Sequence, residues 1–284
     1  GGIAGVGSGA QPNPPAGSER VSIQLGATGD ASGRAESVTL TGKTAVTTNG
    51  ENAFGIVAQS IAGGGGIIMA ANSTVNAASV GMRNNPGNDR DRDASTVTLT
   101  FHPGSSIQTH GAGSHGVVAQ SIGGGGGIAR PTANSGFDIN QNFNSSGAHG
   151  YGDDVSITVN GNITTHGAGA SGILAQTIAG GGGIFGEYAG STGGGSDSQN
   201  RSKAGTTTVA VNASSQVHAT GANARGIAAQ NVMANGIGGG AIQITVDGSV
   251  RGGSGQDSWG IWVDGGTYDV STQTGNNITI GANR

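Results

Sequence analysis

A seven-residue block that recurs four times limits what this chain can fold into more than any other feature. Each copy has a glycine, two apolar residues, an alanine, a glutamine, a small polar residue and a β-branched residue. The copies occupy 55–61, 116–122, 172–178 and 226–232, and a degenerate fifth copy occupies 260–264. The spacing between glutamines is 61, 56 and 54 residues. Such repeats are typical of proteins that stack similar units into one body.

Alternating runs of β-branched and hydroxyl residues precede the blocks. They begin at Val38, Val97, Val155, Val209 and Ile242. A period of two predicts a strand with one buried face, and a second short strand follows each run. We expect each second strand to end at a turn in which a glycine has a positive φ, namely at Gly50, Gly111, Gly167 and Gly221.

Runs of four or five glycines follow the first three blocks. We expect them to be turns in which the missing β-carbon lets the backbone bend or approach a neighbouring strand. A phosphate-binding loop is the alternative, but no Gly-Lys-Ser or Gly-Lys-Thr follows any run. The glycine turns are assigned to Gly63, Gly64, Gly65, Gly66, Gly123, Gly124, Gly125, Gly126, Gly180, Gly181, Gly182 and Gly183.

Composition decides how these units bury apolar surface. The 284 residues include 60 glycines, no cysteine and 4% aromatic residues, so large rings and disulfides cannot build the core. We predict an all-β, right-handed parallel β-helix in which residues 1–284 form a single solenoid segment of about five repeats, cut within a repeat at both ends. Coils of about 20 to 25 residues would give two coils per repeat and a rod roughly 50 to 65 Å long. A five-bladed β-propeller is the alternative fold.

A glutamine lies in the most apolar part of every repeat. An isolated buried amide is costly, so each of these side chains needs a hydrogen-bonding partner. Stacked repeats supply one, because identical amides in register can hydrogen-bond to each other. We therefore expect a structural ladder made of Gln59, Gln120, Gln176 and Gln230.

Polar inserts of variable length separate the repeats, at 70–95, 129–153 and 186–205. Length variation at one fixed point of each repeat predicts loops that leave the same side of the structure. In the first insert Asp89, Asp91 and Asp93 alternate with arginines, which makes them a candidate calcium site. A solvated, internally neutralised loop is the favoured interpretation, because the glycine and glutamate of a calcium loop do not follow. We expect no other cofactor.

The remaining candidate residues have simpler structural interpretations. His110 and His166 occupy a repeat position that carries asparagine or threonine elsewhere, which favours a polar turn residue over a metal ligand. Trp259 and Trp262 are a candidate glycan-stacking surface, for which a plug near the end of a stack is the simpler interpretation.

The block and its polyglycine tail resemble the passenger regions of large bacterial autotransporters, the type V secreted proteins. Residues 114–127, Ser-His-Gly-Val-Val-Ala-Gln-Ser-Ile followed by five glycines, carry the likeness, which extends through the repeats over nearly the whole chain. The resemblance implies a β-helical stalk outside the outer membrane, anchored through a translocator barrel that this sequence does not contain. It also implies a role in adhesion, aggregation or biofilm formation.

Charge narrows the classes of partner. Charged residues make up 10% of the chain and the net charge is −4, which leaves no cationic surface for nucleic acid. No window reaches the roughly 18 consecutive apolar residues of a membrane span. We expect a structural and adhesive protein of the bacterial cell surface, extracellular and not an enzyme. We expect its inserts to contact other cells, matrix or glycans. We expect its coils to stack on other copies of the protein, and end-to-end stacking would produce filaments.

The alternative function is a β-helical carbohydrate-active protein, such as a polysaccharide lyase or a tailspike. Such a protein needs a groove lined by carboxylates and basic residues. The chain has two lysines, Lys43 and Lys203, and its acidic residues are scattered through different inserts. This favours the stalk.

Overall fold

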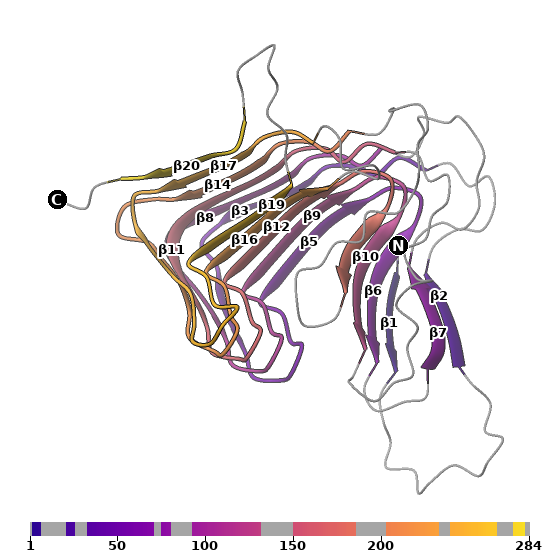
Figure 1. Ribbon diagram of the computed structural model, residues 1–284, viewed down its shortest axis with the longest axis horizontal. Coiled ribbons are helices and arrows are strands. Elements are labelled where there is room, and N and C mark those ends of the chain that lie inside the picture. Colours follow the sequence, from indigo (N-terminus) through magenta and orange to yellow (C-terminus); the bar gives the residue numbers. More distant parts are fainter. Residues whose placement is uncertain are drawn as a thin grey trace, which may run out of the picture.

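The computed structural model describes residues 2–6, 21–25, 33–70, 75–80, 93–131, 150–185, 203–232, 239–265 and 275–281. Within these ranges all regular structure is β-strand, and every pair of neighbouring strands is parallel (Figure 1). These ranges contain no helix that is long and apolar enough to cross a membrane. The all-β prediction is therefore confirmed.

Three sheets contain most of the strands, and we call them the long, middle and glycine sheets. The long sheet contains β3 (Val38–Gly42), β4 (Ala45–Thr48), β8 (Val97–Thr109), β11 (Val155–Thr165), β14 (Thr207–Val211), β15 (Gln216–Ala219), β17 (Ile242–Val246), β18 (Ser249–Arg251) and β20 (Asn277–Ile280). The middle sheet contains β5 (Ile56–Ile61), β9 (Val117–Ile122), β12 (Ile173–Ile178), β16 (Ile227–Val232) and β19 (Ile261–Gly265). The glycine sheet contains β1 (Gly2–Val6), β6 (Gly65–Ala70), β10 (Gly126–Pro131) and β13 (Gly182–Phe185).

A fourth, two-stranded sheet pairs β2 (Val21–Leu25) with β7 (Val75–Val80). Strand β7 lies inside the first insert, where the sequence predicted a loop, so that expectation was wrong for these six residues. The insert thus contributes paired backbone of its own to the protein.

Each repeat forms a single layer of the stack. The chain passes from β8 in the long sheet to β9 in the middle sheet and β10 in the glycine sheet, and the next repeat lies directly on it, with Val117 opposite Ile173. The prediction of two coils per repeat was therefore wrong, because a single pass through the three sheets takes the whole length of the repeat. With β1 one level before β5 and β20 one level after β19, the described stack has seven levels, and six spacings of about 4.8 Å make it about 29 Å high, about half the rod that we expected. A propeller is excluded for these strands, since the first three repeats each contribute to three sheets and all neighbouring strands are parallel.

The main core lies between the long and middle sheets. Side chains at alternate positions of β8, such as Leu99 and Phe101, are fully buried there and pack with Val117 and Ala119 from β9. The residues between them face outward, as the period-two pattern predicted. Each such aliphatic or aromatic side chain contributes about 1.5 to 3 kcal/mol by leaving water.

The middle sheet is buried on both faces, which explains the composition of the repeated block. Val118 and Leu174 point away from the main core and pack with Ile128 and Ile184 of the glycine sheet. All six residues of β9 and of β12 are buried. A parallel strand covered on both sides has a nearly continuous apolar sequence, in contrast to the alternating strands of the long sheet.

The turn between the long and middle sheets needs glycine for a different reason from the expected one. The positive φ angles fall two residues after the glycines that we assigned, at Asn52, Gly113, Gly169 and Asn223. Gly111, Gly167 and Gly221 are required by close stacking instead, whereas a β-carbon on Gly50, in the first layer, would make only an ordinary contact. A β-carbon on Gly167 would lie 1.8 Å from the carbonyl oxygen of Gly111 in the preceding layer, and Gly221 stands in the same relation to Gly167.

A buried amide ladder as the candidate functional site

The glutamines of the four blocks lie above one another on the face of the middle sheet that meets the glycine sheet. Nε2 of Gln59 donates to Oε1 of Gln120 at 2.6 Å, and Gln120 donates to Gln176 at 2.6 Å. Gln176 in turn donates to Gln230. Gln120 and Gln176 are fully buried, so the neighbouring layer replaces the water that each amide loses. The expected hydrogen bonds between the glutamines are present.

Asp264 ends the ladder and fixes its direction. Nε2 of Gln230 donates to Oδ2 of Asp264 at 3.0 Å. An ionised carboxylate only accepts hydrogen bonds, so Gln230 has to turn its nitrogen toward Asp264 and its oxygen toward Gln176. The same reasoning orients every amide before it. At the other end, Oε1 of Gln59 accepts no hydrogen bond from the residues that the structure describes.

The polyglycine runs form the turn into the glycine sheet and the first residues of its strands. Gly124 and Gly125 have φ of 81° and 90°, and Gly126 and Gly127 have φ of 147° and 140°. A β-carbon on Gly126 would also lie 1.8 Å from the carbonyl oxygen of Gly182 in the next layer. Both the backbone conformation and the lack of space therefore require glycine.

The assignment of the glycine turns holds for the first part of each run, since Gly63, Gly64, Gly123, Gly124, Gly125, Gly180 and Gly181 lie in the turn. It was wrong for Gly65, Gly66, Gly126, Gly182 and Gly183, which begin strands β6, β10 and β13. Positive φ angles occur at 63–66, 124–127 and 180–183. Gly123 corresponds to Ala62 and Ala179 of the other layers. Its own constraint is space, because a β-carbon there would lie 2.4 Å from the carbonyl oxygen of Tyr151.

The residue after each glutamine forms a second polar row, on the opposite face of the middle sheet. Ser60 Oγ donates to the carbonyl oxygen of Glu36 and accepts from the backbone N–H of Ser95. Ser121 repeats this arrangement with Ser95 and Asp153. Thr177 and Asn231 occupy the same position in later layers. The sequence reasoning missed this row, although its signal was visible as an unbroken series of small hydrogen-bonding residues.

The carboxylates nearest the inserts also bind backbone. Asp93 Oδ1 accepts a hydrogen bond from the N–H of Tyr151 at 2.9 Å, and Asp154 Oδ1 accepts from the N–H of Thr206 at 2.7 Å. Asp89 and Asp91, the other members of the candidate calcium site, lie outside the described residues. In the described ranges no group of three or more histidine, aspartate or glutamate side chains is placed to hold a metal ion.

The two histidines that share a repeat position stack on the exposed turn. The ring centroids of His110 and His166 are 4.7 Å apart with an interplanar angle of 12°. Nδ1 of His166 lies 3.1 Å from Oγ1 of Thr220, the equivalent residue of the next layer. The position is thus an exposed polar column along the side of the stack.

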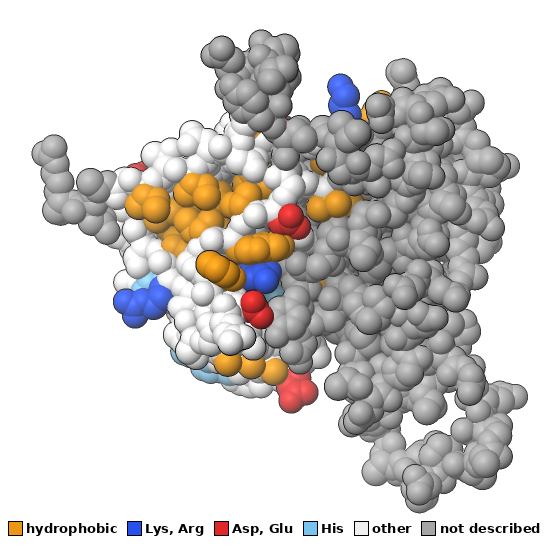
Figure 2. All heavy atoms as spheres, viewed as in Figure 1, with side chains coloured by type: hydrophobic (Ala, Val, Ile, Leu, Met, Phe, Trp, Pro, Cys, Tyr) orange, Lys and Arg blue, Asp and Glu red, His pale blue; other side chains and the backbone are white. Residues whose placement is uncertain are grey.

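Aromatic and aliphatic side chains collect at the β20 end of the stack. The guanidinium of Arg225 lies 4.1 Å above the ring of Trp262, and Trp259 is 50% exposed. Ile278 and Ile280 of β20 are also exposed. Figure 2 shows hydrophobic side chains gathered on the surface over β17 and β20.

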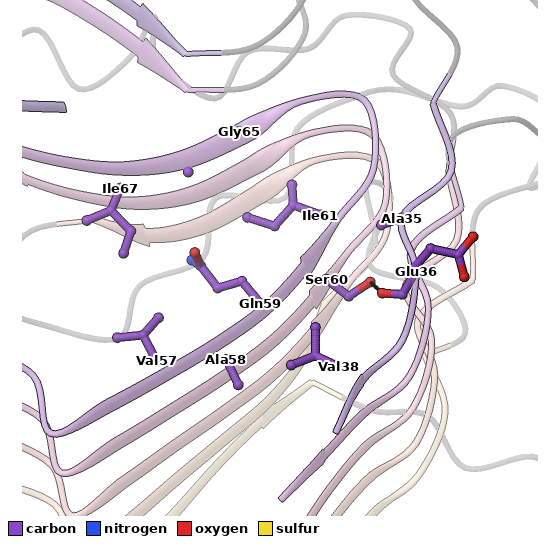
Figure 3. A pocket seen from close by; sticks show the side chains of 11 residues that line it. Ala35, Glu36, Val38, Val57, Ala58, Gln59, Ser60, Ile61, Gly65 and Ile67 are labelled. Carbon is purple, nitrogen blue, oxygen red and sulfur yellow. Dashed lines mark hydrogen bonds between the residues drawn. The ribbon is translucent and has the colours of Figure 1, made fainter. Parts of the chain in front are cut away.

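A hollow of about 590 Å³ opens at the opposite end, beside β5. Val57 and Gln59 of β5 point toward Ile67 of β6 on one side of the middle sheet, and Val38 lies on the other side (Figure 3). Among the described residues of the lining, Glu36 is the one titratable residue, and its carboxylate points away from Gln59. One carboxylate without a second acid or base does not form an acid and base pair.

Comparisons with known proteins give no match, since no family model, no curated protein and no solved structure matches this chain.

Proposed function

We propose that this protein is a structural and adhesive stalk segment displayed outside a bacterial cell, like the autotransporter passengers that its repeats resemble. We further propose that its layers close into a right-handed parallel β-helix. The observation that carries the proposal is the in-register stacking of successive repeats in three parallel sheets. A stack of this kind buries a continuous core and grows in one direction, which suits a molecule that holds binding loops away from a surface.

The use of the polar groups supports a scaffold over an enzyme. The glutamines bond to each other, and Asp93, Asp154 and Asp264 accept hydrogen bonds from neighbouring layers. These carboxylates therefore hold the layers together. A carbohydrate-active site would instead present carboxylates free to reach a substrate.

The inserts are the proposed contact sites for other cells, matrix or glycans. Each insert follows a strand of the glycine sheet and precedes a strand of the long sheet, so its described flanks occupy the same place in every layer. Because the flanks stack, the points at which the inserts leave and rejoin the sheets lie next to each other along one side of the described structure. Several weak contacts made by neighbouring inserts would add up to firm attachment.

An adhesion assay tests this proposal. Microspheres coated with the full chain are expected to attach to bacterial cells or to matrix-coated surfaces. A variant in which glycine–serine linkers of equal length replace 132–149 and 186–202 is expected to lose attachment and keep its β-sheet circular dichroism. Attachment that does not depend on the inserts would contradict the proposal. Release of reducing ends from a polysaccharide by the purified chain would favour the carbohydrate-active alternative instead.

A further inference from the structure

The two ends of the stack are built differently. At the β5 end the glycine sheet extends one strand further than the other two sheets, because β1 pairs with β6 in register, Gly2 opposite Gly66 and Ile3 opposite Ile67. Among the described residues, β3, β4 and β5 are edge strands of their sheets. The hollow described above lies beside these strands and is lined by residues of β5 and β6 and by Ala35, Glu36 and Val38.

The side chains at this edge lack the cover that their equivalents have one layer further on. Val117 and Val118 of β9 are fully buried, whereas Ile56 and Val57, at the same positions of β5, are only partly buried. An extended strand laid along β5 would complete their burial. It would also pair the backbone N–H and C=O groups that β5 presents at its open edge.

The amide ladder determines which side chain such a strand must carry opposite Gln59. Gln59 already donates to Gln120, so the free group at this end is the Oε1 acceptor of Gln59. The amide oxygens of Gln120, Gln176 and Gln230 each accept a hydrogen bond from the glutamine of the layer before them. A strand in parallel register with β5 therefore needs a hydrogen-bond donor opposite Gln59 and an aliphatic residue opposite Val57.

We propose that the β5 edge is a docking site for an extended segment that carries the protein's own Gly-(Ile/Val)-x-Ala-Gln pattern and that pairs parallel to β5. The interface is the continuation of the one that already joins β5 to β9, β9 to β12 and β12 to β16. In this arrangement the amide of the incoming strand donates to Gln59, its small residues meet Ala58, and β1 covers it from the glycine sheet.

The opposite end of a second copy does not meet these requirements. Its edge strand β19 presents Asp264 opposite the glutamine position, and a carboxylate facing Oε1 of Gln59 would bring two acceptors together. In addition, β20 pairs with β17 and so lies one layer beyond β19. If β19 of the second copy paired with β5 of the first, β20 of the second copy would fall where β3 of the first copy already lies, and the two strands would clash.

The test uses the full chain and a capped synthetic peptide of residues 114–123, which holds one copy of the pattern. We expect saturable one-to-one binding by calorimetry. A peptide with Gln120→Glu offers only an acceptor at neutral pH and is expected to bind at least about fivefold more weakly. A matched peptide with Ser121→Thr, the residue of a later layer, is expected to bind like the original.

Hydrogen exchange locates the peptide. Amides of β5 at the open edge are expected to gain protection when the peptide is bound, and those of β19 are not. Equal affinity of the Gln120→Glu peptide, or no added protection in β5 at saturation, would overturn the proposal. An oligomer of the protein alone that the peptide dissociates would show that a second copy fills the hollow, and would overturn it as well.

Discussion

Gln176 sits in the middle of a polar row that crosses an otherwise apolar interface. It accepts from Gln120 and donates to Gln230, and no part of it reaches water. Removing one buried partner costs more than the hydrogen bond itself is worth, because the groups left behind remain buried without water. The ladder therefore stabilises the stack and penalises any layer that slips out of register.

Gln176→Ala is expected to lower the free energy of unfolding by about 2 to 5 kcal/mol, because it leaves a donor and an acceptor unpaired and opens a cavity. Urea denaturation followed by circular dichroism measures the change. Gln108→Ala, at an exposed position of β8, is the control and is expected to stay within about 0.5 kcal/mol of the wild type. An equal decrease in the free energy of unfolding for the two variants would show that the buried ladder does not stabilise the protein more than an exposed glutamine does.

Gly126→Ala is expected to destabilise the protein by about 3 kcal/mol or more, because the residue has φ of 147° and no room for a β-carbon. Gly260→Ala is the matched control, since a β-carbon at Gly260 would have nothing within 4 Å. Thermal unfolding compares the two. A melting temperature of the Gly126→Ala protein close to that of the control would contradict the steric argument.

The residue-scale features that the sequence predicted are those that repeat in a chemically conspicuous way. The glutamines stood out because a polar residue recurred in an apolar run. The later glycines of each run were wrongly assigned to turns, because a run of glycines does not mark where the turn ends and the next strand begins. Asp264 was visible as the odd residue of the degenerate block, but its role as the end of a hydrogen-bonded row depends on three-dimensional stacking.

At the scale of strands, β15 and β18 are paired neighbours in the long sheet, and a histidine links them. Nε2 of His218 lies 2.7 Å from Oγ of Ser249. Burial, and to a smaller degree the charge of Arg251, lower the pKa of His218 below its usual value of 6.5. The unfolded chain therefore takes up this proton at a higher pH than the folded protein does, so protonation favours unfolding.

The contribution of His218 to stability is expected to be complete above pH 6.5 and to decline as the pH falls through 6.5 toward the lowered pKa. His218→Gln is expected to reduce this loss, so its melting temperature should vary less between neutral and mildly acidic pH. Scans of melting temperature against pH measure the difference. His102→Gln, at an exposed position of β8, is the control, and an identical pH profile for His218→Gln and wild type would refute the assignment.

Strands were easier to predict than their arrangement. Alternation identified the strands of the long sheet, and the apolar block identified those of the middle sheet. The pairing of β2 with β7 was not predicted, because Val75–Val80 has small residues in place of a clear alternation and lies in a polar insert. The number of layers per repeat was also missed. The length of a repeat does not determine how many layers it forms. Here one layer takes the whole repeat, partly because β8 alone has 13 residues.

At the scale of the whole molecule, one layer per repeat means that whole repeats are interchangeable units (Figure 1). Deleting residues 117–172, the 56-residue spacing between two glutamines, joins Gly116 to Ile173 and brings β5 beside β12. The shortened protein is expected to fold and to unfold cooperatively. Its denaturant m-value should be about a fifth lower, because less surface is exposed on unfolding.

Deleting half as much, residues 117–144, is the informative counterpart. It would leave the remaining strands without matching partners, so this variant is expected to be unfolded or aggregated. Both products are compared by circular dichroism and by chromatographic size. A folded half-repeat variant would mean that the chain completes a coil twice in each repeat, contrary to the pairing seen here.

Stacking in register copies the outward surface of the long sheet as well as its core. Thr39, Thr98, Ser156 and Thr208 are opposite one another in consecutive strands, so their hydroxyl groups form a line with one group per layer. A polymer with a similar repeat distance would meet the same chemical group at each step. Lengthening such a protein by one repeat would then add one binding unit together with one structural layer. The avidity for the polymer would rise with the number of repeats, although each contact would stay the same.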